Sequence, residues 1–475
     1  MRMTSKQRWV LALASVASFM ISLDSLVVAT ALSTIRRDLG ASIETLEWTV
    51  NAYNLTFAVL LMTGAALGDR FGRRRMFMAG LALFTAASVG CALSPGIGWL
   101  VAARAVQGAG AALVMPLALT QLSTAFPAHQ RGRALGIFSG VTGLATFSGP
   151  FIGGAVTEGL AWEWIFWLNL PIGLMAILLV AGRIEESRGP NNRFDVGGLL
   201  LETGAAFGLV WGLVRANSAG WGSAEVAGSL MAAVVLFAAF VAWERQADAP
   251  MLPMRLFRIR AFSTANAANF ALFGSLFGTL FFLAQYLQAA LGYGPFGAGL
   301  RLMPWTATLM ICAPIAGAIA DRLGERRFMV GGLLLQTVAM SWLALIVKPD
   351  LAYAQMLLPL IMGGCGISMA MPAAQKSVVG AVAAQEIGKA SGALSTLRIF
   401  GGVFGIAVAA AVFTQWGSLA SPRAFTDGFA AAMGFVAVLA FAGAIAGLGM
   451  PGRREAGTAA PVPAVAGPPA ETVAN

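Results

Sequence analysis

Long apolar runs separated by short polar breaks recur along the whole chain. Most runs are about 20 residues long, the length that an α-helix needs to cross a hydrocarbon core about 30 Å thick. We therefore predict an all-α polytopic membrane protein with fourteen transmembrane helices. The expected helices cover residues 10–32, 46–67, 77–94, 98–123, 134–157, 164–182, 196–214, 225–243, 263–287, 299–320, 328–347, 352–372, 391–415 and 429–449.

The polar break after the second helix returns in the second half of the chain. Residues 67–74 are Leu-Gly-Asp-Arg-Phe-Gly-Arg-Arg, and residues 319–326 are Ile-Ala-Asp-Arg-Leu-Gly-Glu-Arg. This repeat predicts two six-helix halves around a central midplane site, joined by a two-helix insert. The predicted units are a first half at 1–182, the insert with its linkers at 183–262, a second half at 263–450 and a disordered tail at 451–475.

Composition agrees with a membrane protein, and charge sets its orientation. Hydrophobic residues make up 58% of the chain and charged residues 11%, against roughly 25% charged residues in soluble domains. Of the 31 Lys and Arg residues, 23 fall on the side of the N-terminus and six on the other, so the positive-inside rule predicts that both termini are cytoplasmic. The net charge of +10 then reflects juxtamembrane topology and not nucleic acid binding.

Cysteine and histidine predict no further chemistry. Cys91, Cys312 and Cys365 stand alone in apolar stretches without metal-ligand spacing, and His129 lies in a polar loop. The chain shows no phosphate-binding loop, so an ATP-driven pump has no support within it. We expect no metal, no enzymatic activity and no cofactor; the energy source would be the proton motive force.

The repeated turn resembles the signature loop between helices 2 and 3 of the major facilitator superfamily. The resemblance implies that its aspartate favours the outward-facing state, and Gly72 allows a tight turn with positive φ. For the arginines, a role in topology alone stays open. The gating residues implied in the two copies are Asp69, Arg70, Gly72, Arg73, Asp321, Arg322 and Gly324.

Two further segments resemble motifs of this superfamily. Residues 100–112 resemble its helix-4 motif, whose intramembrane arginine, here Arg104, is implicated in proton coupling. A segment of the fifth helix resembles the motif of proton antiporters, and its proline and glycines predict a bending point with close helix contacts. The residues of that segment are Gly149, Pro150, Gly153 and Gly154.

Aromatic segments resemble one branch of the superfamily, the fourteen-helix drug:proton antiporters (EmrB/QacA-like multidrug exporters). These segments are Trp48 with Tyr53, residues 162–173 and residues 286–295. The start of helix 1 around Asp24 matches the branch, but the rest of that helix is less polar than its pattern. The resemblance implies proton-coupled export of a drug, antibiotic or toxic amphipathic small molecule across the bacterial cytoplasmic membrane.

Two charged residues lie at similar depth inside the first half. Counting about 1.5 Å per residue, Asp24 on helix 1 and Arg104 on helix 4 reach the same level of the membrane. Since these two helices face the cavity in the superfamily, we predict that the side chains approach each other. Protonation of Asp24 would then free Arg104 and bias the inward- and outward-facing states; a static structural ion pair is the alternative.

Other polar residues inside helices complete the candidate site. Glu202 is a secondary proton-carrier candidate, with a structural role as the alternative because it lies near the cytoplasmic end of its helix. Arg398 either lines the cavity or packs against carbonyl groups. The candidate substrate cavity comprises Asp24, Tyr53, Arg104, Gln107 and Arg398.

Two other functions stay open. Proton-coupled uptake, or export of a specific metabolite, is possible on the same fold, and substrate accumulation in expressing cells would favour uptake. A non-transporting membrane receptor is the second alternative, favoured if no ligand shows flux linked to a pH gradient. The expected partners are an amphipathic small molecule, protons and the lipid bilayer.

Overall fold

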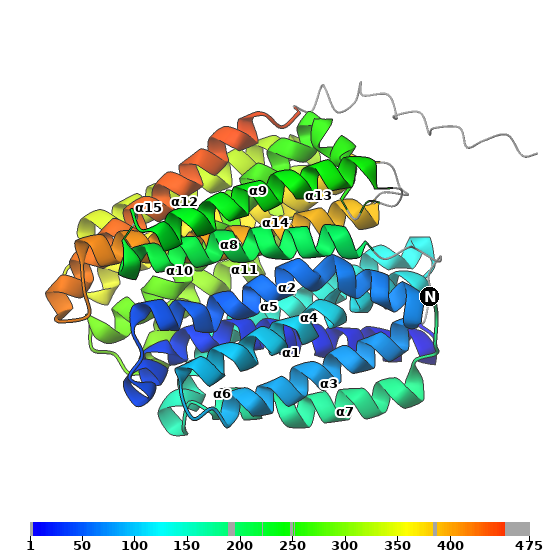
Figure 1. Cartoon of the computed structure of the whole chain (residues 1–475), viewed down its shortest axis with the longest axis horizontal. Coiled ribbons are helices and arrows are strands. Elements are labelled where there is room, and N and C mark those ends of the chain that lie inside the picture. Colours follow the sequence, from blue (N-terminus) through cyan, green and yellow to red (C-terminus); the bar gives the residue numbers. More distant parts are fainter. Residues whose placement is uncertain are drawn as a thin grey trace, which may run out of the picture.

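The computed structural model describes residues 3–188, 195–220, 222–247, 250, 252–382 and 387–451, apart from some side chains within helices. In these ranges the regular structure is entirely helical, with fifteen α-helices, one 3-10 helix and no strand (Figure 1). The long helices run side by side as one bundle. This architecture agrees with the predicted all-α class.

The helices follow one another with short connections. The first seven are α1 (Ser5–Leu39), α2 (Ile43–Phe71), α3 (Arg73–Ala92), α4 (Ile97–Ala125), α5 (Ala128–Gly159), α6 (Trp164–Trp167) and α7 (Asn169–Arg183). Next come α8 (Val196–Ala219), α9 (Ala224–Gln246) and the 3-10 helix η1 (Met254–Arg258). The last six are α10 (Arg260–Ala289), α11 (Pro295–Leu323), α12 (Glu325–Ile346), α13 (Tyr353–Gly380), α14 (Ile387–Trp416) and α15 (Pro422–Leu448).

Most of these helices suit a bilayer. In the described ranges, eleven are long and apolar enough to cross a membrane, and twelve if the bent helix α2 counts as one span. The predicted number of fourteen is larger, because α5 and α11 are not among them. Both helices include residues that lie outside the described part of the structure, so the described ranges do not test them as membrane spans. The protein is thus a multi-pass membrane protein with at least eleven candidate spans.

Helix boundaries differ from the predicted ones because caps extend the helices past their apolar runs. Helix α1 begins after a capping box in which Thr4 and Gln7 bond each other's backbone, and ends where Gly40 takes a φ of 62°. The predicted helix at 164–182 is interrupted at Leu168, which separates the short α6 from α7. That break places Asn169 at the start of α7.

The central helices position the candidate site. Helix α1 contacts α4, α5 and α7 of the first half and α10 and α11 of the second half, and 72% of its apolar stretch is buried. Helices α8 and α9 pack on each other, and α8 also contacts α2 and α14. In Figure 1, α1 to α7 gather in the lower part of the view and α10 to α15 in the upper part, with α8 along the seam.

Candidate functional site

Asp24 of α1 and Arg104 of α4 form an ion pair inside the bundle. Arg104 Nη1 donates to Asp24 Oδ2 at 2.5 Å, and each residue is 1% exposed. The predicted approach of these side chains is therefore present in the structure. Burying two charges costs several kcal/mol per ion, and the attraction offsets this only when further hydrogen bonds satisfy the remaining polar atoms.

Amide side chains supply those hydrogen bonds to the carboxylate. Asp24 Oδ1 accepts from Gln107 Nε2 at 2.8 Å and from Asn169 Nδ2 at 2.7 Å. The same two amides donate to Ser88 Oγ of α3, at 2.7 and 3.2 Å. Side chains of four helices, α1, α3, α4 and α7, therefore meet in one hydrogen-bonded cluster around this carboxylate. A change of charge at Asp24 would disturb the contacts of all four.

The guanidinium of Arg104 is held from its own helix and from α2. Its Nε donates to the Thr49 carbonyl at 3.1 Å, and Nη1 also donates to Gln107 Oε1 at 2.6 Å. The Tyr53 ring lies face-on, with its centre 4.1 Å from the guanidinium carbon, close enough for a cation–π interaction. The cation thus keeps partners besides Asp24 and would remain tethered to α2 if Asp24 were neutralised.

A close approach of α2 and α4 sets this arrangement. A Cβ atom at Gly108, one turn beyond Arg104, would lie 2.3 Å from the Tyr53 carbonyl oxygen, so only glycine fits there. Across the same contact, Thr56 Oγ1 donates to the Ala105 carbonyl at 2.8 Å. The backbones of α2 and α4 are therefore in contact at this point, and this contact holds the Tyr53 ring against the Arg104 guanidinium.

The five predicted cavity residues do not all meet. Four of them form one cluster, namely Asp24, Tyr53, Arg104 and Gln107. Each of the four is at most 1% exposed, so in this conformation the cluster is closed to solvent. Arg398 lies apart on α14, with its guanidinium carbon 5.3 Å from the centre of the Phe273 ring of α10. Among the described side chains Arg398 is in no ion pair.

Glu202 also lies away from the cluster. It is half-buried on α8, in the helix pair α8–α9, and takes part in no ion pair among the described side chains. None of the hydrogen bonds described above reaches it. The structure therefore does not join Glu202 to the Asp24 cluster.

The glycine–proline motif of α5 packs between two helices. Cβ atoms at Gly149 and Gly153 would meet Leu26 and Thr30 of α1 at 2.8 and 2.4 Å. On the next face of α5, a Cβ at Gly154 would lie 2.4 Å from the Pro295 carbonyl oxygen of α11. Conversely, one at Gly299 of α11 would lie 2.2 Å from the Pro150 carbonyl oxygen. The motif thus brings three backbones together at the centre of the bundle.

The turn between α2 and α3 is stabilised from two sides. Gly72 has a φ of 111°, and Arg73 Nε bonds Asp69 Oδ1 at 2.8 Å. The carboxylate of Glu186, which follows α7, accepts from the backbone N–H groups of Arg74 and Arg75 at 2.9 and 3.2 Å. An acidic group at a helix N-terminus is favourable because it binds free N–H groups. Arg70 is exposed and lies over the Phe71 ring.

The second copy of the turn has the same backbone feature. Gly324, between α11 and α12, has a φ of 92°. The side chains of Asp321 and Arg322 lie outside the described part of the structure, so their predicted contacts are not described. The two copies therefore agree in the glycine that ends each second helix.

Segments far apart in the sequence close the end of the bundle opposite the N-terminus. Ser33 of α1 bonds Gln288 of α10, and Gln288 Nε2 donates to the Thr30 carbonyl at 3.1 Å. Glu158 of α5 accepts from the backbone N–H of Phe296 at 2.9 Å. These contacts join α1 and α5 to α10 and α11. The bundle is thus closed on that side of the Asp24 cluster.

The family described as Major Facilitator Superfamily matches residues 14–263 and 265–472. The chain belongs to the major facilitator superfamily. The protein is accordingly a transporter rather than an enzyme. Its motifs and its all-helical bundle agree with this membership.

Relatives of this facilitator carry names of antibiotic export proteins. The tetracenomycin C resistance and export protein of Streptomyces glaucescens is 37% identical, over 83% of this chain and 73% of its own length. The cephamycin export protein CmcT of Amycolatopsis lactamdurans is 35% identical over 93% of this chain and 92% of its own. The multidrug resistance protein Stp of Mycobacterium tuberculosis is 35% identical over 84% and 74%.

Solved structures share the fold of this facilitator. A POT family transporter crystallised with 5-aminolevulinic acid superimposes with a TM-score of 0.70 at 14% identity, covering 92% of this chain and 94% of that one. A peptide transporter POT crystallised with sulfate gives a TM-score of 0.67 at the same identity. At this identity the likeness shows the fold alone.

Three residues of the facilitator's buried contacts were not predicted. Ser88 and Asn169 bond the amides and carboxylate around Asp24, and Glu186 caps α3. Asn169 lies within a segment that resembled the drug antiporter branch, and a polar amide in an apolar run was the available signal. Ser88 and Glu186 gave no such signal, because small hydroxyl residues are common in helices and acidic residues are common in loops.

Proposed function

We propose that this protein exports a drug, antibiotic or toxic amphipathic small molecule across the bacterial cytoplasmic membrane in exchange for protons. The export direction is supported by relatives named for tetracenomycin export, cephamycin export and multidrug resistance. Proton coupling is supported by one observation above all, the sealed ion pair between Asp24 and Arg104. A buried carboxylate held by donors from two other helices, α4 and α7, is suited to transmit its charge state to the bundle.

The proposed mechanism follows from the contacts of Asp24. A proton that binds a carboxylate oxygen removes the attraction to Arg104 and turns one acceptor into a donor. The amides of Gln107 and Asn169 then lose their charged acceptor, and the contacts between α1, α4 and α7 weaken. Arg104 stays on α2 through Thr49 and Tyr53. Protonation would thereby loosen α1 from α4 and favour one of the two alternating states.

The gating elements of this proposal lie on either side of that cluster. The α5 motif would bend between α1 and α11 as the halves move. The turns after α2 and α11 would engage when the N-terminal end of the bundle closes, through Asp69 and Arg73 in one copy and Asp321 and Arg322 in the other. Asp69 already bonds Arg73 in the conformation described, which supports a role in ordering its own turn.

We further propose fourteen membrane crossings with both termini in the cytoplasm. Helices α2, α5 and α11 would complete the eleven candidate spans, since they pack side by side with spans in the same bundle. The units would be 1–182, 183–262 and 263–450, followed by the tail at 451–475. The excess of Lys and Arg on the N-terminal side supports this orientation.

Loading expressing and non-expressing bacteria with a fluorescent amphipathic dye tests the direction of transport. Expression should lower the dye content of energised cells, and a protonophore should abolish the difference. Dye accumulation above the non-expressing control would instead support uptake. An unchanged dye content for a panel of neutral, anionic and cationic dyes would contradict multidrug export.

A further inference from the structure

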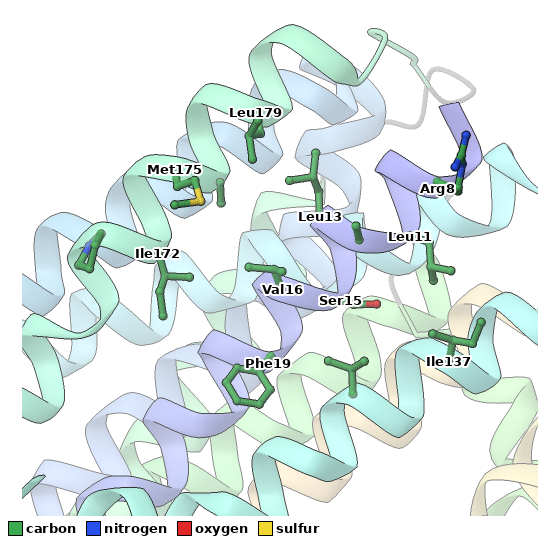
Figure 2. Close-up of a pocket in the computed structure, with 14 residues that line it drawn as sticks. Arg8, Leu11, Leu13, Ser15, Val16, Phe19, Ile137, Ile172, Met175 and Leu179 are labelled. Atoms are coloured by element: carbon green, nitrogen blue, oxygen red, sulfur yellow. The ribbon is translucent and has the colours of Figure 1, made fainter. Parts of the chain in front are cut away.

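A groove lies along the exposed face of the N-terminal part of α1, between α5 and α7 (Figure 2). It encloses about 680 Å³. Its floor is a stripe of α1 that repeats at helical spacing, formed by Arg8, Ala12, Val16 and Phe19. These four residues are exposed or half-exposed, whereas most of α1 is buried. Between residues 10 and 19 the other residues of α1 are buried, so in this stretch the helix is exposed only along the groove.

The walls of the groove are apolar and one of them is rigidly supported. Figure 2 shows Ile137 of α5 on one side and Met175 and Leu179 of α7 on the other. Met175 is 62% exposed, as expected of a side chain that meets lipid. On its far side α7 packs tightly on α3, where a Cβ at Gly173 would lie 2.0 Å from Thr85 Oγ1. This close contact fixes the wall formed by α7 against α3.

The mouth of the groove is cationic. Arg8 lies at the N-terminal end of the stripe, and Arg183, at the end of α7, has its guanidinium carbon 4.9 Å from the centre of the Trp9 ring. Lys6 is neutralised by Glu185 at 2.5 Å, but Arg8 and Arg183 are in no ion pair among the described residues. Two guanidinium groups without a paired carboxylate, at the N-terminal end of the bundle, attract an anionic lipid headgroup and repel a cationic one.

The length of the groove matches one membrane leaflet. Arg8 and Phe19 are eleven residues apart on α1, which corresponds to about 16 Å of helix. Half of a hydrocarbon core about 30 Å thick is about 15 Å. An acyl chain whose headgroup sits at Arg8 would therefore end near Phe19.

One polar atom interrupts the apolar lining. Ser15 lines the groove, is 6% exposed, and its hydroxyl has no hydrogen-bond partner among the described residues. Of the lining residues that the structure describes, only Arg8 and Ser15 carry side-chain nitrogen or oxygen atoms. The rest of the described lining is apolar, which suits an acyl chain.

We propose that this groove is a binding site for an anionic phospholipid of the leaflet at the N-terminal end of the bundle. The phosphate binds Arg8, and one acyl chain lies along α1 to Phe19. The inner end of the groove is formed with Pro171 and Ile172, two and three residues after Asn169, which donates to Asp24. The bound chain therefore packs against the start of α7, the helix segment that positions this donor. The proposal does not depend on the direction or the substrate of transport.

Photolabelling of the full-length protein in phosphatidylcholine vesicles tests the site. The probe is phosphatidylglycerol at low mole fraction with a diazirine near the end of one acyl chain. We expect adducts concentrated on the peptides of α1 and α7 that contain Phe19 and Ile172. Arg8→Gln should lower the yield at these peptides about fivefold, the effect of one basic residue on an anionic lipid, and Arg8→Lys should retain it.

Matched variants separate this site from general lipid contact. Arg245 lies exposed in the last turn of α9, on the same helix as the exposed apolar residue Val234 and at the spacing that separates Arg8 from Phe19. Arg245→Gln should leave the yield on α1 and α7 unchanged. Ala12→Trp and Met175→Trp each fill the groove from a membrane-facing position and should each remove the adducts. Val234→Trp controls for the added ring, and a monodisperse elution profile checks folding.

Three results would overturn the proposal. Equal labelling by the phosphatidylcholine analogue would show that the headgroup is not recognised. Adducts spread evenly over the exposed helices, α9 included, would indicate ordinary annular lipid. Protection of the groove by a transported dye, without protection by unlabelled phosphatidylglycerol, would identify it as a route for substrate.

Discussion

The Asp24–Arg104 pair can be tested as an energetic unit by a double-mutant cycle. Arg104→Gln leaves a buried carboxylate without its counter-charge, and Asp24→Asn leaves a buried guanidinium without one. Removing one partner of a buried pair typically costs about 3–5 kcal/mol. In the double variant, amides replace both charges and can still bond Gln107 and Asn169, so part of the cost disappears. We expect a coupling free energy of about 2–3 kcal/mol.

The exposed pair of Lys6 and Glu185 is the matched control. Its charged atoms are also 2.5 Å apart, but the two side chains are 53% and 77% exposed. Exposed pairs contribute about 0–1 kcal/mol, so the control cycle should give a much smaller coupling. Unfolding in mixed detergent micelles, followed by the fluorescence of the 12 tryptophans, measures both cycles. A coupling below about 0.5 kcal/mol for the buried pair would refute the energetic argument.

The same variants distinguish a switch from a static pair. If the pair only stabilises the fold, the double variant should recover proton-driven transport together with its stability. If Asp24 carries the proton, the double variant recovers stability but not coupling. Transport by the double variant at the wild-type rate, with unchanged dependence on the pH gradient, would therefore favour the static interpretation.

Three further predictions follow from the packing of glycines and from Arg398. Gly154→Ala should loosen α5 from α11 and reduce transport, because its Cβ would lie 2.4 Å from the Pro295 carbonyl oxygen. Gly159→Ala on the same helix places a Cβ with no atom within 4 Å and should leave transport unchanged. The rates of dye efflux of the two variants test this difference. Gly72→Ala should lower the free energy of unfolding by about 1–3 kcal/mol, because it puts a side chain at a φ of 111° and 2.7 Å from Glu186 Cδ. Unfolding in detergent measures this loss. Stability equal to that of Gly96→Ala, where a Cβ meets no atom within 4 Å, would contradict the prediction. Arg398→Gln should reduce efflux of anionic dyes more than that of neutral dyes if this cation lines the substrate path, and an equal loss for both classes would favour a packing role.

The sequence carried enough information for the class of fold and for the central pair. Apolar runs of membrane length predict helices reliably because the bilayer requires internal hydrogen bonding. Asp24 and Arg104 could be paired because charges are rare at such depth and helical rise converts residue number into depth. The resemblance to the superfamily supplied the last step, namely which helices face each other.

Other parts of the site could not be derived in this way. Asn169 reaches Asp24 from the start of α7, and hydropathy does not reveal which face of that helix meets α1. Glu186 caps a helix 112 positions earlier in the chain, which requires the tertiary fold. The sequence predicts that Arg398 is a buried cation, but it does not tell which helices surround it, and the structure places it apart from the Asp24 cluster.

The most direct test of the central claim is proton movement during transport. The wild-type protein and Asp24→Asn are reconstituted in equal amounts into vesicles that contain a pH-sensitive dye. A transported substrate is then added, and the rate of proton flux is compared with the rate of substrate flux. We predict that substrate drives proton flux in the wild type and that Asp24→Asn abolishes this flux while still binding substrate. Substrate-driven proton flux in Asp24→Asn at the wild-type rate would contradict the assignment of Asp24 as the proton carrier.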